Sequence, residues 1–198
     1  YRGVEVATRR PDWAAGVPAQ YLRKVQRLDY ALGVIHIDDL AELPITVRSH
    51  RFAFSRRAAI ADWRGWLHAR EGRANGFWQP QWQMDLTQTG AIAADGLELR
   101  VRAVDYSTRY AADPGRQDLA LLHRSGRWYF RRVVSASTLG EDELLELDAA
   151  LGIDAAPGDF TLITWLVPAR LDADEVELTW HTAGVVTSTV DIRSLRTP

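Results

Sequence analysis

The residue types that could do chemistry in this chain are histidines and carboxylates, because cysteine is absent. The five histidines are His36, His50, His68, His123 and His181. No two of them stand four residues apart around a glutamate, so the zinc-binding pattern of helical metalloproteases is missing. The sequence also lacks a glycine-rich phosphate loop and a G-x-S-x-G nucleophile turn. Without cysteine, thiol catalysis, disulfides and thiolate metal sites are excluded.

The densest carboxylate cluster lies near the end of the chain and contains Asp172, Asp174, Glu175 and Glu177. Several oxygens in one place are what a calcium ion requires. Glu175 and Glu177 alternate with the apolar residues of a predicted strand, which places them on its exposed face. The two aspartates fall in the turn before that strand. We therefore predict a solvated turn and no metal site.

The remaining carboxylates also indicate structural roles. Glu141–Glu143 follow a glycine and suit the first turn of a helix, where the helix dipole stabilises carboxylates. The periodicity of residues 139–151 leaves a strand equally open. A glycosidase needs two carboxyl groups at a set separation. Asp85 and Glu175 are a conceivable pair, but nothing in the sequence selects them, so we predict no enzymatic activity and no cofactor.

The clearest predicted elements lie between residues 51 and 85. A strand ending in Phe54 leads to Ser55, whose side-chain oxygen suits a helix N-cap. Apolar residues then recur at helical spacing, which predicts a helix over Arg56–Arg70 packed on a sheet, and Gly72 ends it. An aromatic strand follows. The predicted core between helix and sheet consists of Phe52, Phe54, Ile60, Trp63, Leu67 and Trp78.

The rest of the chain is rich in strand signals. Leu97, Leu99 and Val101 alternate with charged residues, which predicts a half-buried antiparallel strand. Turn residues predict hairpins at Ser125-Gly126 and at Gly184. With one helix among many short strands, we predict a mainly β fold, a sandwich or barrel with one amphipathic helix packed on a sheet. Two β-rich domains are expected, at residues 1–92, with the helix at 56–71, and at 93–198.

Three N-terminal segments carry specific expectations. Tyr1–Ala7 alternates weakly and is expected to form a short edge strand. Tyr21–Ile37 is expected to form two strands with a turn near Asp29. In Ile45–Phe54 the apolar residues switch phase, so we expect either a bulge near Ser49 or a strand that passes between two layers.

Composition bounds the class of protein. A chain of 198 residues fits one large or two small domains. The net charge of -2 argues against a nucleic-acid-binding protein, which would carry a basic excess. No apolar run long enough to span a membrane is present, and we see no signal peptide in the sequence given. Lys24 is the only lysine among 24 basic residues, and arginine suits protein interfaces better than lysine does.

Two stretches resemble tail-tip structural proteins of long-tailed bacteriophages, the distal tail protein group and its relatives. In the first stretch, a strand and a helix lead into W-L-x-A-R-E-G-R and then F-W-Q-P-x-W-x-x-D-L; the matching residues are Arg70, Gly72, Arg73, Phe77, Trp78, Pro80 and Asp85. The second stretch, R-L-D-x-D-E-V-x-L-x-W before a final hairpin, begins at Arg170. Together the two stretches cover about a third of the chain.

The resemblance implies a structural virion protein of the phage baseplate. Identical subunits would form a homo-oligomeric ring between the tail tube and the tip proteins. Within the chain we single out Arg9, Arg10 and Trp13 as candidate interface residues, because arginine and tryptophan dominate interface hot spots. The alternative that Trp13 folds onto its own domain stays open. A different alternative, a carbohydrate-binding module at the tail tip, requires Trp13, Trp78 and Trp82 to lie on one open face.

Overall fold

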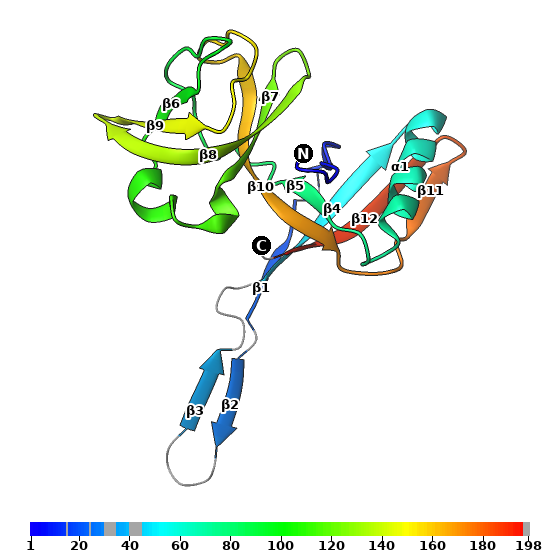
Figure 1. Cartoon of the computed structure of the whole chain (residues 1–198). Coiled ribbons are helices and arrows are strands. Elements are labelled where there is room, and N and C mark those ends of the chain that lie inside the picture. Colours follow the sequence, from blue (N-terminus) through cyan, green and yellow to red (C-terminus); the bar gives the residue numbers. More distant parts are fainter. Residues whose placement is uncertain (15, 24, 30–34, 40–44, 196–198) are drawn as a thin grey trace. The chain divides into compact units, whose positions relative to one another are not determined.

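The structure is a computed structural model that describes residues 1–14, 16–23, 25–29, 35–39 and 45–195. The fold is mainly antiparallel β with one α-helix, α1 (Arg57–Arg70), which confirms the predicted fold class (Figure 1). The strands are β1 (Ala19–Leu22), β2 (Val25–Asp29), β3 (Ile35–Asp39), β4 (Ile45–Phe54), β5 (Phe77–Pro80), β6 (Glu98–Arg102), β7 (Asp118–His123), β8 (Trp128–Leu139), β9 (Asp142–Leu147), β10 (Phe160–Leu171), β11 (Leu178–Thr182) and β12 (Val185–Ser194). A short π-helix (Tyr106–Tyr110) and a 3-10 turn (Pro114–Arg116) complete the elements.

The chain divides into two compact units, and neither is continuous in sequence. The first unit contains residues 1–8 and 78–168, and the second contains residues 9–77 and 169–195. The expected boundary between residues 92 and 93 therefore falls inside the first unit, and that expectation is corrected. The physical reason is β10, because its first half pairs with β7 and its last residues pair with β12.

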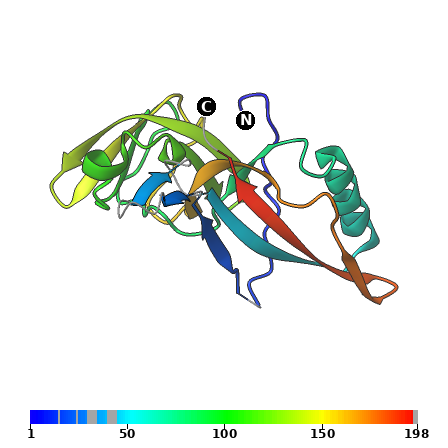
Figure 2. The ribbon, with the colours of Figure 1, turned by 90° about the horizontal axis from the view of Figure 1, so that it is seen from below.

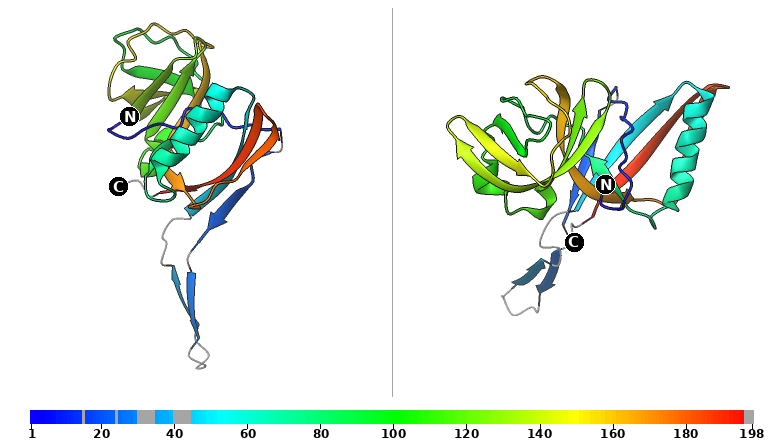
Figure 3. Two further views of the ribbon diagram at one scale, coloured as in Figure 1. Left: turned by 90° about the vertical axis from the view of Figure 1, so that its right-hand side faces the viewer. Right: turned by 45° about the horizontal axis from the view of Figure 1, so that its top comes forward.

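The first unit is a small barrel. Its strands pair in the order β10, β7, β8, β9, β6, and they curl around a common core (Figure 3). The segment after β5 closes the barrel, because the amide of Asp85 donates to the carbonyl of Ile163 (3.0 Å) and the amide of Arg102 donates to the carbonyl of Thr87 (2.9 Å). The largest fully buried side chains of this core are Tyr106, Leu86, Leu99, Leu119, Leu121, Leu145, Leu147 and Ile163.

A second, smaller cluster of the first unit contains Trp78. Its indole packs with the ring of Tyr1 at 5.4 Å, and Val6 forms a single parallel bridge with Trp78. The predicted edge strand at residues 1–7 is thus reduced to one bridge. Trp78 does not belong to the core between α1 and its sheet, which corrects that assignment. The sequence spacing placed Trp78 beside Phe77, but the chain passes from one unit to the other between these two residues.

The second unit is a sheet of β1, β4, β12 and β11 with α1 on one face (Figures 2 and 3). The indole of Trp63 in α1 lies 4.6 Å from the ring of Phe52 and 5.4 Å from that of Phe54. Ile60 is buried and Leu67 is half-buried. The predicted packing of the helix on β4 is confirmed for these residues, with Leu67 at the margin of the core.

The ends of α1 differ in part from the prediction. The N-cap is Arg56, in extended backbone and without a side-chain cap, so the expected Ser55 cap is wrong. Ser55 lies one residue too early to reach the first free amides. At the other end, Glu71 and Gly72 both have positive φ, 50° and 63°. A Cβ on Gly72 would lie 2.6 Å from a carboxylate oxygen of Asp174, so only glycine fits there.

The structure of β4 shows how the strand accommodates apolar residues that change from one face to the other along its sequence. Its register with β12 runs without a shift from the Phe54–Val186 pair to the Val47–Arg193 pair, so the expected bulge is absent. His50 and Phe54 are buried on one face, and Val47 is buried on the other. The strand is therefore covered on both faces only near Val47, because the face that carries Val47 is exposed at Ala53, and the second expectation holds only in part.

The predicted hairpins at Ser125-Gly126 and Gly184 are confirmed as β7–β8 and β11–β12. Strand β6 alternates as predicted, with Leu99 and Val101 fully buried. Residues 142–147 form strand β9, not a helix.

Candidate assembly surface

Arg9, the first candidate interface residue, is engaged inside its own unit. Its guanidinium carbon lies 5.2 Å from the ring centre of Phe54 and 5.6 Å from that of Trp63. Its Nη1 donates to the carbonyl of Ala59 at 3.2 Å. A guanidinium stacked on two rings and hydrogen-bonded to the helix backbone stabilises the core of the second unit. Arg9 is therefore a packing residue of this unit.

Arg10 and Trp13, the other two candidates, remain exposed. The chain between them is held along β4, because the amide of Asp12 donates to the carbonyl of Arg51 at 2.6 Å and the two side chains form an ion pair at 3.2 Å. Trp13 is 40 % exposed, so it is not core. The segment is docked on its own unit but presents one large indole to solvent.

The strongest surface feature is one that sequence reasoning did not single out. Strands β2 and β3 pair with each other, and among the described residues neither joins the large sheet. We call this pair of strands the apolar hairpin, because Val25, Ile35 and Ile37 are 49 %, 45 % and 64 % exposed. Tyr21 and Leu22 in β1, just before it, are 69 % and 40 % exposed.

Together these five residues expose roughly 500 Å² of surface, which is not one continuous apolar patch, because Ile37 and Ile35 lie directly opposite Arg27 and Asp29 in the hairpin. That area is about two thirds of what one partner buries in a standard protein interface. The sequence signal was present as an alternation of isoleucines at residues 35 and 37. Alternation alone predicts a strand but does not say whether anything covers its apolar face.

The two stretches that carry the family resemblance contact each other in the second unit. Asp174 accepts hydrogen bonds from the backbone amide of Arg73 (3.0 Å) and from its guanidinium (2.7 Å at Nη2). The hydrogen bonds from Arg73 hold the pKa of Asp174 below its usual range. Gly72 allows the close approach. The Gly-Arg and Asp-x-Asp motifs thus form one structural junction between α1 and the turn before β11.

The carboxylate cluster of the second unit is paired with arginines. Asp172 binds the guanidinium of Arg193, and Asp174 binds Arg73. Within the described residues, no group of three or more histidine or carboxylate side chains is arranged to hold a metal ion. Glu175 and Glu177 are exposed as predicted, but they lie in the segment before β11 and not in a strand.

Glu143 is a buried carboxylate with a structural role in the first unit. It accepts hydrogen bonds from the amides of Val104, Tyr106 and Ser107, at 2.7 to 3.0 Å, and from the hydroxyl of Ser107. Burial by itself would raise the pKa of Glu143, but these donors outweigh it and the pKa is lowered. The carboxylate, from strand β9, holds the short π-helix at Tyr106–Tyr110. A strand was one of the two possibilities that the sequence left open for the segment that contains Glu143.

Asp85, one member of the conceivable glycosidase pair, supports the first unit. Its carboxylate accepts hydrogen bonds from the hydroxyl of Thr164 (2.7 Å) and the amide of Trp165 (2.9 Å).

Trp78 and Trp82 are both 8 % exposed. Two of the three tryptophans that a sugar-binding face would need are therefore buried, which removes the feature that favoured a carbohydrate-binding module.

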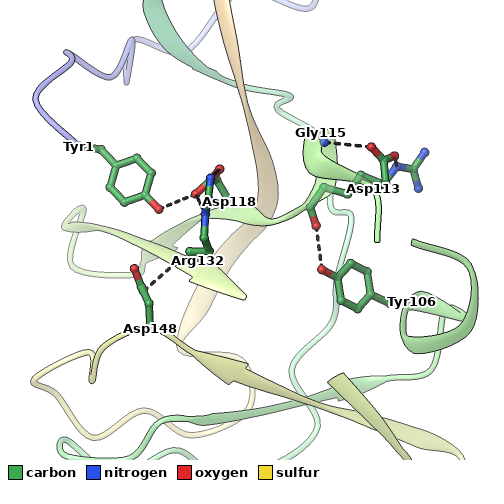
Figure 4. Close-up of polar contacts among 8 residues, drawn as sticks. Tyr1, Tyr106, Asp113, Gly115, Asp118, Arg132 and Asp148 are labelled. Atoms are coloured by element: carbon green, nitrogen blue, oxygen red, sulfur yellow. Dashed lines mark hydrogen bonds and ion pairs between the residues drawn. The ribbon is translucent and has the colours of Figure 1, made fainter. Parts of the chain in front are cut away.

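Asp118, Arg132 and Tyr1 of the first unit are joined by hydrogen bonds around the carboxylate of Asp118 (Figure 4). Asp118, which is 1 % exposed, accepts hydrogen bonds from Arg132 at 2.7 and 3.0 Å and from the Tyr1 hydroxyl at 2.6 Å. The amide of Arg132 donates to Asp148 at 2.9 Å. Burial and the hydrogen bond to Asp118 raise the pKa of the Tyr1 phenol. Burial likewise raises the pKa of Tyr106 to about 12, so neither phenol is suited to act as a base near neutral pH.

His50 makes the stability of the protein depend on pH. It is 1 % exposed in β4, and burial, aided by the charge of Arg48, lowers its pKa from 6.5 to about 4. Because the unfolded chain binds a proton that the folded protein excludes, we expect the free energy of unfolding to fall as the pH drops from 6.5 towards 4. The loss should reach about 3 kcal/mol. Urea unfolding at several pH values would measure it.

His50→Leu should flatten this dependence, whereas His68→Gln, at an exposed position of α1, should leave it unchanged. Glu143 and Asp174 have lowered pKa values and reduce stability only at still lower pH. A wild-type unfolding energy that stays constant from pH 6.5 to 4.5 would contradict the buried neutral imidazole.

A scan against protein-family models finds no match for this chain, and a search of curated proteins finds no similar sequence. None of the helices in the described part of the chain is long and apolar enough to cross a membrane.

Proposed function

We propose that the protein is a structural subunit that assembles with copies of itself through the apolar hairpin, in the tip of a bacteriophage tail. The observation that supports assembly is the exposure of Val25, Ile35 and Ile37. A two-stranded hairpin is marginally stable by itself in water, and it becomes stable when further strands or an apolar surface cover it. A subunit contact provides that cover.

The tail tip is proposed because of the two stretches that resemble distal tail proteins. Their contact through Arg73 and Asp174 supports the resemblance, since residues from both motifs serve one junction. The chemistry of the described residues also suits a structural role. Asp85, Asp118, Glu143 and Asp172 are all engaged with amides, hydroxyls or guanidinium groups of their own unit.

The mass of the purified particle tests the assembly. We expect light scattering behind a sizing column to give several subunits per particle at about 100 µM protein, because interfaces of modest area bind weakly. Ile37→Asp should reduce the mass to one subunit, since it places a carboxylate in the apolar contact. Val134→Asp, at a residue 56 % exposed on β8, is the matched control and should keep the wild-type mass. A wild-type protein that stays at one subunit would refute assembly.

The location in the virion needs a separate experiment. Antibodies against the protein, viewed by electron microscopy on intact tails, should label the end of the tail distal to the capsid. Label on the capsid or along the tube, or none on any particle, would exclude the tail tip while leaving the assembly itself open to the mass measurement.

A further inference from the structure

Strand β11 offers an edge that matches the apolar hairpin. Among the described residues β11 pairs with β12 alone, so its other edge presents free backbone groups. The strand contains no lysine, acidic residue or proline, which are the residues that usually protect an edge. Its one irregularity in register lies between Trp180 and Thr182, next to the turn. Trp180 is 53 % exposed, and Val185, the first residue of β12, is 36 % exposed.

The apolar hairpin supplies the complementary features. Each of its two strands has a free edge among the described residues, and it exposes three β-branched side chains. Adding such a hairpin to a sheet edge satisfies backbone hydrogen bonds on both sides and covers apolar side chains at the same time. Trp180 and Val185 add apolar surface from the β11 side, so the two partners together contribute roughly 700 Å², less than half of the about 1,600 Å² that a standard interface buries, as expected of a weak contact.

The hairpin of a chain cannot reach the β11 edge of that same chain. Leu22, from which the hairpin departs, pairs with Ile45, whereas Leu178 of β11 aligns through Ser188 with Phe52. Seven residues along β4 correspond to about 23 Å, and the three strand spacings from β1 to β11 add about 14 Å sideways, which makes about 27 Å in all.

The chain that leads from Leu22 into the hairpin is too short to span the distance between Leu22 and β11. Val25 follows Leu22 by three residues and so lies within about 11 Å of it, and Asp29 lies within about 25 Å even when the chain is fully extended. Neither end of β2 can therefore align with β11 of its own chain. A hairpin that adds to this edge therefore comes from another copy.

We propose that the apolar hairpin of one subunit adds to the β11 edge of the next, with Trp180 covering its isoleucines. This inference rests on the proposed assembly and names its second surface. The hairpin is the donor of this contact and the β11 edge is the acceptor, and they lie at opposite corners of one sheet. The contact is therefore head to tail, and repeating it generates a closed ring or an open filament. Two hairpins pairing with each other would instead give a closed dimer.

A mixing experiment separates these possibilities. Ile37→Asp removes the donor and keeps the acceptor, whereas Trp180→Asp removes the acceptor and keeps the donor. We expect each variant alone to have the mass of one subunit, and an equimolar mixture to form a particle of two subunits that grows no further. Circular dichroism would verify folding, with Ile35→Asp and Trp180→Lys replacing any variant that fails to fold. Val134→Asp is again the control.

Other outcomes overturn the inference in distinguishable ways. If Trp180→Asp assembles like the wild type while Ile37→Asp does not, β11 is not the acceptor, and the proposed assembly through the hairpin stands. If both variants are single subunits but their mixture does not associate, the contact is not head to tail. If the wild-type protein is itself a single subunit, the proposed function and this inference fail together.

Discussion

Replacing Trp63 with alanine is expected to lower the free energy of unfolding by about 3–5 kcal/mol, the usual cost of removing a large buried aromatic side chain. The indole is 2 % exposed and stacks on Trp66 with ring centres 5.0 Å apart. It also contacts the rings of Phe52 and Phe54. No neighbouring side chain can fill the space without leaving its own contacts, so a cavity remains between α1 and the sheet.

The midpoint of urea unfolding, followed by circular dichroism, would measure this loss. Trp13→Ala is the matched control, because the same side chain is removed from a position that is 40 % exposed, and we expect a cost below about 1 kcal/mol. Trp63→Ala with the midpoint of the wild type would show that α1 does not depend on this ring.

The second large effect is expected from Asp118→Ala in the first unit. The substitution leaves the guanidinium of Arg132 and the Tyr1 hydroxyl without their shared acceptor. Breaking a buried ion pair by removing one partner costs about 3–5 kcal/mol, and we expect the lower value because Arg132 is 23 % exposed and keeps some contact with water.

Two further variants show whether the buried charge causes the effect. Asp142→Ala breaks the pair with Arg100, whose side chain is 48 % exposed, and should cost less than about 1 kcal/mol. Combining Asp118→Leu with Arg132→Met removes both charges and should recover much of the stability lost in Asp118→Ala. Equal losses of unfolding free energy in Asp118→Ala and Asp142→Ala would mean that burial does not increase the contribution of the Asp118–Arg132 pair to stability.

Local patterns in the sequence were sufficient for most individual elements. The spacing of Ile60 and Trp63 predicts α1, and the alternation of Leu99 and Val101 predicts β6. These predictions succeed because the side-chain period of a helix or strand is a property of the backbone alone. The Ser55 cap failed because a one-residue shift in the start of the helix decides which side chain reaches the free amides.

The division into units could not be read from the sequence. The boundary expected after residue 92 lies within the barrel of the first unit. The second unit depends on where β12 returns to pair with β4, and that pairing joins residues more than 100 positions apart, such as Phe52 and Ser188. Pairing at such a distance leaves no local signal.

The sequence by itself determined that this protein is mainly β with one amphipathic helix, that it has no thiol chemistry, and that Glu175 and Glu177 are exposed. Only the tertiary structure decided which apolar side chains are covered. Trp78 and Trp82 are buried, whereas Ile37 and Trp180 are exposed, although all four are large apolar residues. The reason is that burial depends on which other segment packs against a strand. That segment is chosen by long-range pairing, which local periodicity does not encode.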